Sequence, residues 1–434
     1  MRKKLLAGIL ALALCSTNMP PQTIFAEEFT SGNPDVVSEE ETPEIFTNEE
    51  LEAAGETDEE LSVFSSDEVP EFNDAPDEAM AAAENEQAGE IDLADNDKVM
   101  NGVYTIRSAG DHKFTCSRET GNRIVVDGKG ISPKASINIY LNKVNINTSN
   151  GPALQINVNV EATVTIYLTG TNNLITKHTW YAGLQKVNTA LLIITTNVSD
   201  TTAGILNAHG SSDGDGAGIG GGLSGSCSNI TIESCSVIAS SNYGAGIGGG
   251  KQGAGSKITI NSASVTASST DGAGIGGGLY GAGSGSDITI NSSSVTASST
   301  NGAGIGGGEG NSCENITINS SSVTASSTNG AGIGGGYEYG GSCKNITING
   351  GSVKASSVSG SPTNEGKEVY CCTIENPENA NVTIKPGTGS NWKPVNHSSL
   401  DPDDTNLYVW LPKLEDNSTK SNYVITLNQE NGSE

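Results

Sequence analysis

The strongest constraint on the fold is a short segment that recurs through the middle of the chain. The sequence Ala-Gly-Ile-Gly-Gly-Gly recurs every 28 or 30 residues, beginning at Ala217, Ala245, Ala273, Ala303 and Ala331. An Ile-Thr-Ile segment and a Ser-Val-Thr-Ala-Ser segment, or variants of them, recur with the same period. Such self-similarity is typical of solenoids, in which each repeat forms one coil and buries its apolar side chains only by stacking on its neighbours.

Each repeat holds three short runs in which apolar and polar residues alternate. This alternation predicts half-buried strands, and the Gly and Ser residues between the runs are typical of turns. Three strands in each coil of about 28 residues predict an all-β chain folded as a parallel β-helix. The inward side chains would then form columns of Ile, Val and Ala, as for Ile258, Ile260, Val265 and Ile275 in one coil.

Composition divides the chain into five parts. Residues 1–26 combine a basic start with a short apolar run, which is typical of a secretory signal peptide. Residues 27–98 contain 26 acidic residues and one basic residue, whereas the whole chain has a net charge of −28. This bias predicts a disordered, extended spacer, or alternatively a loose cation-binding tail. The strand pattern predicts a solenoid over 136–360, with an N-terminal cap at 99–135 and a C-terminal cap at 361–434.

The same features exclude several classes of function. An acidic chain lacks the basic surface that nucleic acids require. No apolar run after the signal segment is long enough for a transmembrane helix. Arginine occurs only at four positions before the repeats, so the repeats lack an arginine base of the kind used by polysaccharide lyases. Their carboxylates lie mostly at turns, without the pairing that hydrolases need. We therefore predict no enzymatic activity.

Outward-facing positions are the candidates for binding. The middle residue of each Ile-Thr-Ile segment forms a column that includes Thr259, Thr289 and Thr317, beside a column of asparagines. These side chains can form hydrogen-bonded ladders along the stack, or they can present a polar face to sugar hydroxyls. The glycine-rich strand also has two interpretations, namely tight coil geometry or a flat surface on which an extended polymer or another solenoid can lie.

Aromatic residues are sparse but occur at loops. Trp180, Tyr181, Tyr337 and Tyr339 are candidate platforms for sugar rings. The alternative is that these side chains pack partly against the side of the solenoid.

Two carboxylates lie close together in one turn. Asp213 and Asp215 are separated by a single glycine, and they are candidate ligands for a hard cation such as Ca²⁺. Aspartate beside glycine is also a common turn former.

Seven cysteines follow the signal segment. Cys227, Cys313 and Cys343 occupy the same position in their coils. The last two would be direct neighbours, at a separation that permits a disulfide, and the alternative is a column of free thiols. No Cys-x-x-Cys spacing indicates zinc. The sequence leaves the pairing of the other cysteines open, namely Cys116, Cys235, Cys371 and Cys372.

The chain also resembles a known bacterial family. Segments at 102–106, 122–128, 139–142 and 165–174 are similar to those of clostridial carbohydrate-binding β-helix proteins that bind pectic polygalacturonate. The Ala-Gly-Ile-Gly-Gly-Gly coils are similar to those of large surface proteins of gut Firmicutes. The resemblance covers about residues 99–360, and it implies a right-handed parallel β-helix, Ca²⁺ sites and glycan binding without hydrolysis.

We therefore expect a secreted or cell-surface protein that binds a polysaccharide without cleaving it, with Ca²⁺ as a bridge if the glycan is acidic. The alternative is a structural adhesin or surface stalk that acts through contacts with proteins or a cell wall. An ice-binding surface is a third interpretation, but the paired threonine arrays expected of one are missing.

Overall fold

The structure, a computed structural model, is built from β-strands throughout its described part. None of the described residues forms a helix, so this part of the chain contains no helix able to cross a membrane. All described residues belong to one compact unit that comprises residues 1–29 and 88–434. The structure describes residues 89–95, 99–197, 203–280, 284–338, 341–364, 366–375 and 406–412, and the strands at 23–24, 381–386, 395–397 and 423–428.

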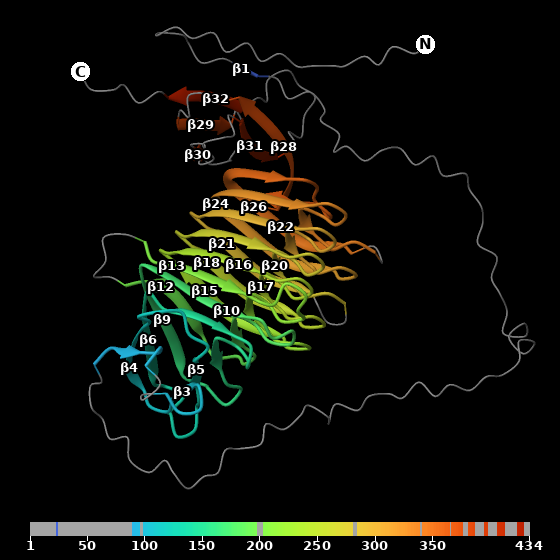
Figure 1. The fold of residues 1–434 in the computed structure, drawn as a ribbon. Helices are drawn as coiled ribbons and strands as arrows, with labels where there is room; N and C mark the ends of the chain where they lie inside the picture. Colours follow the sequence, from blue (N-terminus) through green and yellow to red (C-terminus); the bar gives the residue numbers. More distant parts are fainter. Residues whose placement is uncertain are drawn as a thin grey trace, which may run out of the picture. The chain divides into compact units, whose positions relative to one another are not determined.

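The strands stack in three parallel series, one for each side of a solenoid (Figure 1). The first series is β4 (Gly110–Thr115), β6 (Ser136–Asn142), β9 (Thr163–Thr169), β12 (Leu192–Thr196), β15 (Cys227–Glu233), β18 (Gly255–Asn261), β21 (Gly285–Asn291), β24 (Cys313–Ser327) and β26 (Cys343–Ala355). The second series is β7 (Asn145–Thr148), β10 (Thr171–Thr176), β13 (Ile205–His209), β16 (Ser236–Ser240), β19 (Ser264–Ser268), β22 (Ser294–Ser299) and the later halves of β24 and β26.

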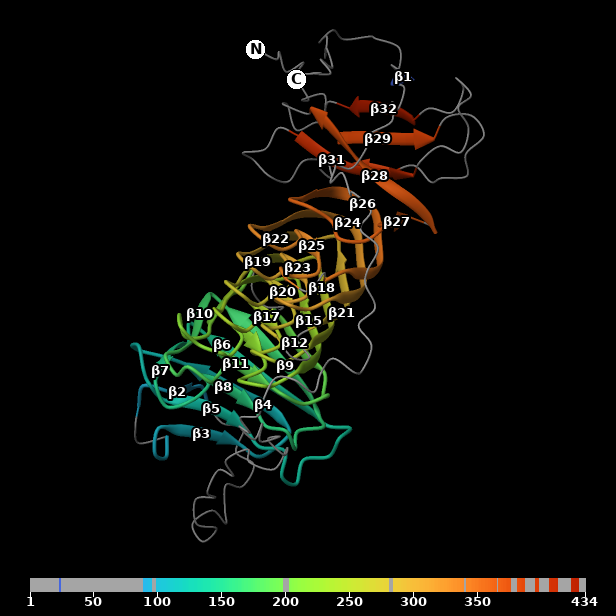
Figure 2. The same ribbon diagram turned by 90° about the vertical axis from the view of Figure 1, so that its right-hand side faces the viewer.

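The third series carries the glycine-rich segments, and Figure 2 shows its strands in succession. It comprises β3 (Val103–Ile106), β5 (Arg123–Val126), β8 (Leu154–Ile156), β11 (Leu184–Lys186), β14 (Ile219–Gly220), β17 (Ile247–Gly248), β20 (Ile275–Gly276), β23 (Ile305–Gly306) and β25 (Ile333–Gly334). Each strand pairs with its counterpart one coil later, as Ile258 does with Ile288. The predicted parallel solenoid with three strands in each coil is therefore confirmed.

Columns of identical side chains fill the core. Ile230, Ile258, Ile288, Ile316 and Ile346 are all fully buried, and so are the isoleucines of the third series from Ile219 to Ile333. Because a lone coil cannot enclose these side chains, their burial depends on stacking, at roughly 25 cal/mol for each Å² of apolar surface removed from water.

The solenoid begins earlier than predicted. Residues 99–135 were expected to form a cap, but β3, β4 and β5 pair in parallel with the coils that follow. The end of the predicted spacer is also wrong, because β2 (Ile91–Asp92) pairs with β4 and Leu93 is fully buried. Degenerate strands conceal a repeat when they lack the glycine segment. The predicted signal peptide and the rest of the predicted spacer lie outside the described residues, apart from the short strand β1 (Thr23–Ile24).

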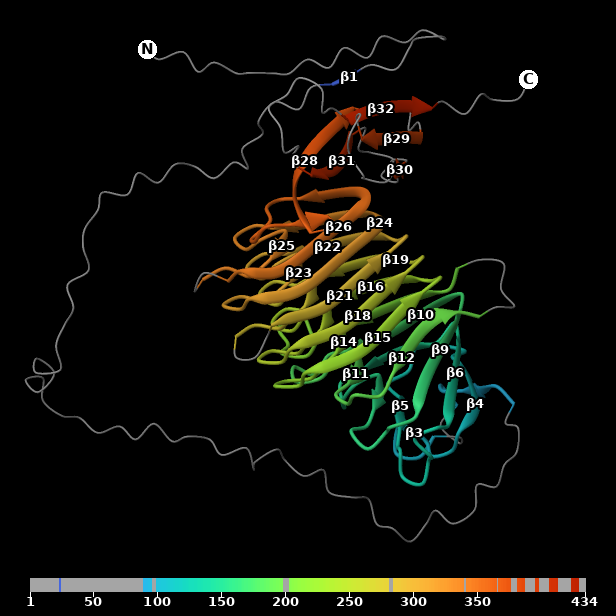
Figure 3. The same ribbon diagram turned by 180° about the vertical axis from the view of Figure 1, so that it is seen from behind.

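The parallel pattern ends after β26, and Figure 3 shows this region from behind. β27 (Thr363–Asn364) makes one parallel pairing with β26 and then pairs antiparallel with β28 (Lys367–Glu375). β28 is antiparallel to β31 (Asn406–Pro412), and β29 (Asn381–Pro386) is antiparallel to β30 (Val395–His397) and β32 (Tyr423–Asn428). The Trp410 indole nitrogen donates a hydrogen bond to the Val353 carbonyl, which ties β31 to the last coil.

Asparagine side chains form hydrogen-bonded ladders along the outer surface. The Asn291 amide donates to Asn261 at 2.8 Å, Asn319 donates to Asn291 at 2.7 Å, and Asn349 donates to Asn319 at 2.8 Å. The structural interpretation of this column is therefore confirmed. Thr259, Thr289 and Thr317 lie in register beside it and are half-buried.

Close contact between main chains explains the invariant glycines of the third series. Gly248 has a φ of 142°, and a Cβ atom placed on it would overlap the carbonyl oxygen of Gly276 in the next coil. That carbonyl accepts a hydrogen bond from the Gly249 amide at 2.9 Å. The glycines of these segments are buried, so they do not form the exposed flat surface that was the alternative interpretation.

We predict that Gly248→Ala lowers the free energy of unfolding by at least about 2 kcal/mol, because alanine is strained at this φ and its methyl group meets backbone that cannot rotate away. The matched control is Gly121→Ala, since Gly121 has an ordinary φ and a Cβ there would first meet the Asn147 carbonyl oxygen at 3.9 Å. Chemical denaturation measures both variants. Equal stability of the two would contradict the proposed role of close main-chain stacking.

One cation lies inside the solenoid. Lys186 is fully buried in β11, and its ammonium group donates hydrogen bonds to the carbonyl oxygens of Asn188 at 2.7 Å and Ser228 at 2.6 Å. Burial lowers the pKa of Lys186 from 10.5 to about 8, because it removes the hydration that stabilises the charged form. The folded chain therefore releases this proton at a lower pH than the unfolded chain does.

This lysine should make stability rise with pH. The unfolded chain holds the Lys186 proton up to about pH 10.5, whereas the folded chain releases it at about pH 8. Between pH 8 and pH 10 the wild type should gain about 2 kcal/mol more stability than Lys186→Met. Denaturant unfolding at both pH values measures the difference, with the exposed Lys344→Met as control. Parallel pH dependence of wild type and Lys186→Met would rule out the buried ammonium as the cause.

Candidate functional site

One edge of the solenoid carries residues that differ from repeat to repeat. Two residues follow each Gly-Gly-Gly and change in chemistry from coil to coil, and so does the residue before each Gly-Ala-Gly. We call these positions the turn edge. Its residues are Leu223-Ser224, Lys251-Gln252, Leu279-Tyr280, Glu309-Gly310 and Tyr337-Glu338 after the glycines, and Asp215, Tyr243, Asp271, Asn301 and Asn329 before them.

Main-chain hydrogen bonds hold the turn edge in register. The residue after Gly-Gly-Gly donates its amide to the carbonyl of the residue before Gly-Ala-Gly in the preceding coil. This bond joins Lys251 to Asp215, Leu279 to Tyr243, Glu309 to Asp271 and Tyr337 to Asn301, at 2.7 to 2.9 Å. These bonds align the side chains of successive coils in one row along the edge, although the residues are far apart in the sequence. Because the main chain makes these bonds, the side chains are free to vary.

The first predicted aromatic pair lies at the beginning of this edge. The Trp180 carbonyl accepts the Leu223 amide at 2.7 Å, which attaches the Trp180 loop to the turn edge. The Trp180 side chain is half exposed. The Tyr181 ring is tilted against the His178 ring at a centroid distance of 4.6 Å, so Tyr181 is partly packed and Trp180 offers the more open surface.

The two predicted calcium ligands have other partners. An Asp215 carboxylate oxygen lies 3.2 Å from the Lys251 ammonium, which also sits 4.8 Å from the centre of the Tyr243 ring. Asp213 accepts a hydrogen bond from the Ser211 hydroxyl at 2.7 Å. Calcium requires six to eight oxygen ligands, and within the described residues no cluster of three or more His, Cys, Asp or Glu side chains is present to hold a metal. The arrangement does not fit a calcium site, and calcium binding stays a prediction.

A second acidic group lies farther along the edge. Glu309 is 9% exposed and accepts a hydrogen bond from the Tyr280 hydroxyl at 3.1 Å. Burial raises the pKa of Glu309, and the negative charges of Asp271 and Glu338 raise it further. Asp271, Glu309 and Glu338 are therefore close enough for their charges to interact, although they come from three different coils.

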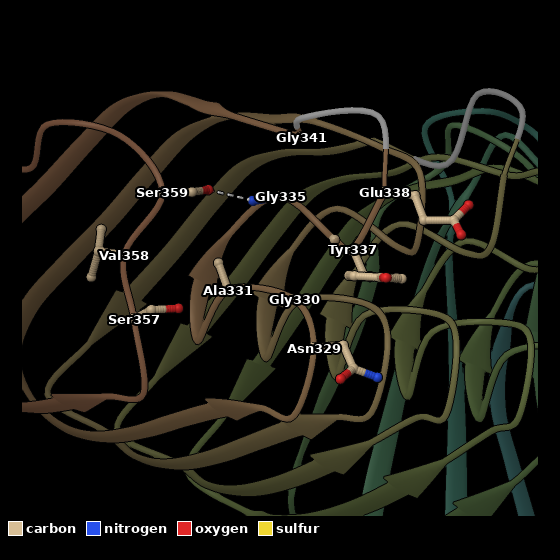
Figure 4. A pocket seen from close by; sticks show the side chains of 11 residues that line it. Asn329, Gly330, Ala331, Gly335, Tyr337, Glu338, Gly341, Ser357, Val358 and Ser359 are labelled. Carbon is tan, nitrogen blue, oxygen red and sulfur yellow. Dashed lines mark hydrogen bonds between the residues drawn. The ribbon is translucent and has the colours of Figure 1, made fainter. Parts of the chain in front are cut away.

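The turn edge ends in a pocket of about 340 Å³. Figure 4 shows the side chains of Asn329, Tyr337 and Glu338 on one side of it, and those of Ser357, Val358 and Ser359 on the other. Tyr337 is 48% exposed. Glycines and Ala331 form the rest of the wall, where mainly backbone is exposed. The side chains around it supply an aromatic ring (Tyr337), a carboxylate (Glu338), an amide (Asn329) and the serine hydroxyls. The described residues that line it are Asn329, Gly330, Ala331, Gly335, Gly336, Tyr337, Glu338, Gly341, Ser357, Val358 and Ser359.

The pocket occupies the place of a missing repeat. Val358 bridges Ile333 as the next strand of the third series would, and the Ser359 hydroxyl accepts the Gly335 amide at 2.8 Å. No glycine-rich turn follows, because the next segment leads to β27. The space that a further turn would have filled is therefore open.

Three main-chain groups face this opening without their usual partners. In earlier coils the equivalents of the Asn329 carbonyl, the Gly341 carbonyl and the Glu338 amide all bond to the next turn. Examples are the Gln252 and Gly310 amides, which donate to the carbonyls of Leu279 and Tyr337. At the last turn, no described residue bonds to any of the three groups.

A disulfide joins the first residues of β24 and β26, the strands before and after the turn that carries the pocket. Cys313 and Cys343 are bonded, with Cα atoms 4.4 Å apart, so the disulfide alternative of the sequence analysis is confirmed. Cys116, Cys371 and Cys372 are half-buried thiols. Burial raises the pKa of Cys227 and of Cys235 to about 12, which keeps both as unreactive thiols.

The structure thus groups some of the predicted residues and separates others. Asp215 and Tyr337 belong to the turn edge and the Trp180 carbonyl is bonded to it, whereas Thr259, Thr289 and Thr317 lie on the strands of the first series. Tyr339 lies outside the described residues. The sequence analysis missed Lys251, Glu309 and the pocket, although variation after each Gly-Gly-Gly was visible as a signal.

Comparisons with known proteins agree with the observed fold. A sequence profile described as a beta helix repeat matches residues 258–279, 288–309, 316–337 and 346–361. No curated protein and no solved structure matches the chain. The first three matched segments run from the Ile-Thr-Ile strand through the glycine-rich turn, and the fourth begins at the same strand, so the chain carries beta helix repeats and folds as a parallel β-solenoid.

Proposed function

We propose that this protein binds a polysaccharide without cleaving it, through the turn edge and its terminal pocket, at the outside of the cell. A parallel β-helix is compatible with a polysaccharide-binding or surface protein. The observation that carries the proposal is the pocket at the last turn, where a half-exposed aromatic ring lies beside three main-chain groups that bond to no described residue.

The chemistry of this pocket suits a sugar. A hydroxyl group both donates and accepts hydrogen bonds, so it can satisfy the Asn329 carbonyl and the Glu338 amide alike. The Tyr337 ring provides an apolar surface for one face of a sugar ring. Small-molecule sites commonly combine aromatic surface with a few such directed polar groups, and the volume of about 340 Å³ lies within their range of about 300–1,000 Å³.

Trp180 supports an extended mode of binding. It lies at the other end of the turn edge and is also half exposed. A polymer lying along the edge would meet Trp180, Tyr280 and Tyr337 in turn, which suits a chain of sugars better than a single one. If the polymer is pectic, calcium would have to bridge its carboxylates to Asp213 or to other acidic groups of the edge.

Surface attachment through proteins is the second candidate function. It is favoured by the continuous asparagine ladders, which couple successive coils from Asn261 to Asn349 and suit a scaffold. On this view the turn edge contacts protein partners or a cell wall instead of free glycan.

Affinity electrophoresis of the full chain distinguishes the two. Native gels containing polygalacturonate, neutral glucan, chitosan or no polymer are run with calcium or with EDTA. We expect at least one polymer to retard the protein, and Tyr337→Ala to weaken that binding by about 2 kcal/mol, roughly 30-fold.

The matched control is Tyr167→Ala. Tyr167 is stacked on Tyr140 in the first strand series, away from the turn edge, with ring centroids 4.7 Å apart. It should leave retardation unchanged. Absence of retardation in every gel would count against carbohydrate binding and favour the protein-contact alternative. Dependence on calcium would identify cation bridging, and equal binding in EDTA would exclude it.

A further inference from the structure

The polarity of the terminal pocket is set two coils away, by a carboxylate. Asp271 can only accept hydrogen bonds when ionised, so the Asn301 amide must turn its NH₂ group toward it, at 2.6 Å. The Asn301 oxygen then faces the next coil and accepts the NH₂ group of Asn329 at 2.7 Å. This column therefore ends with the Asn329 side-chain oxygen, for which the next coil has no described partner.

The rim of the pocket is consequently rich in acceptors. The Asn329 side-chain oxygen, the main-chain carbonyls of Asn329 and Gly341, and the Glu338 carboxylate all accept hydrogen bonds. Opposed to them are the Glu338 amide and the hydroxyls of Ser357, Ser359 and Tyr337. A ligand with several donors at one atom would match this rim better than one with acceptors.

The negative charge around the pocket also favours a ligand that donates hydrogen bonds and carries a positive charge. Among the described residues that line the pocket, Glu338 is the one charged residue and none is basic. Asp271 and Glu309 lie near enough for the Glu309 carboxylate to interact with both Asp271 and Glu338. A uronic acid would add a further negative charge to this group, whereas an ammonium would reduce the repulsion.

The turn edge already holds one ammonium group, that of the Lys251 side chain. The Lys251 ammonium lies 3.2 Å from an Asp215 oxygen and 4.8 Å from the centre of the Tyr243 ring. An acidic group and a tyrosine face together hold that cation, through ion pairing and a cation–π contact. In the pocket, Glu338 and Tyr337 supply the same two groups without a lysine.

We propose that the pocket selects an amino sugar with a free ammonium group, in preference to neutral sugars and to uronic acids. The ammonium is bound by the Glu338 carboxylate, the Asn329 oxygens and the Tyr337 face, and the sugar hydroxyls bond to the Glu338 amide and to the serines. This inference rests on the proposed function, which it makes more specific.

The test compares three probes of equal length by isothermal titration calorimetry on the full chain. They are a β-1,4-linked glucosamine oligosaccharide, its N-acetylated form and a galacturonate oligosaccharide, all at pH 6. We expect the glucosamine form to bind at least 10-fold more tightly than the other two. Glu338→Gln should reduce its affinity roughly 10-fold and leave that of the N-acetylated form nearly unchanged.

The matched control is Glu314→Gln. Glu314 is an exposed carboxylate on β24 of the same coil, so the change in net charge is identical, and neither substitution disturbs the core. Equal losses in both variants would show that the attraction is nonspecific and would overturn the inference. N-acetylated or galacturonate probes binding as tightly as glucosamine would overturn it too, while leaving polysaccharide binding intact. Failure of these probes and of every polymer in the gels would overturn both proposals.

Discussion

Main-chain hydrogen bonding between successive glycine-rich segments is the interaction on which the rest of this structure depends. The Gly221, Gly249, Gly277 and Gly307 amides each donate to a glycine carbonyl one coil later, at 2.9 or 3.0 Å. These bonds need close approach of two backbones, which any side chain at Gly248 or its equivalents would prevent. The three strands of a coil belong to one continuous chain. The contact that fixes the register of the glycine-rich strand therefore also fixes the register of the other two strands.

Register in turn gives the columns their properties. Apolar columns face inward and are fully buried, whereas asparagines on the outside form a ladder in which the amides of Asn291 and Asn319 both donate and accept. A ladder transmits orientation along the stack. The carboxylate of Asp271 therefore determines which atom Asn329 presents at the pocket, although Asp271 lies two coils earlier in the column. The hydrogen-bonding groups that the last coil presents thus depend on residues in the preceding coils.

Much of the fold was predictable from the sequence, because strict repetition shows both the strand period and the inward positions, such as Ile258 and Val265. The limits of the solenoid were not predictable, since β3 to β5 lack the glycine segment and were mistaken for a cap. Of the candidate site, Trp180 and Tyr337 were recognised as exposed aromatics. The partners of Asp215 could not be foreseen, because the ion pair with Lys251 depends on which turn positions face each other across coils.

The pocket could not be predicted from the sequence, for a related reason. It arises from the absence of one more repeat after Tyr337, and an unfilled position leaves no motif in the sequence. Its shape becomes apparent only once the bonds of the earlier turns are known, because these show which groups at the last turn have lost a partner. A binding site of this kind follows from where an array stops, as much as from the residues it contains.

Amide hydrogen exchange, followed residue by residue in the full chain, tests this account most directly. The amides of Gln252 and Gly310 donate to the next coil, whereas no described residue accepts from the equivalent Glu338 amide. We expect Gln252 and Gly310 to be strongly protected from exchange and Glu338 to exchange at the rate of an open amide. Protection of Glu338 equal to that of Gln252 would contradict the account, since the pocket would then not be the open place of a missing turn.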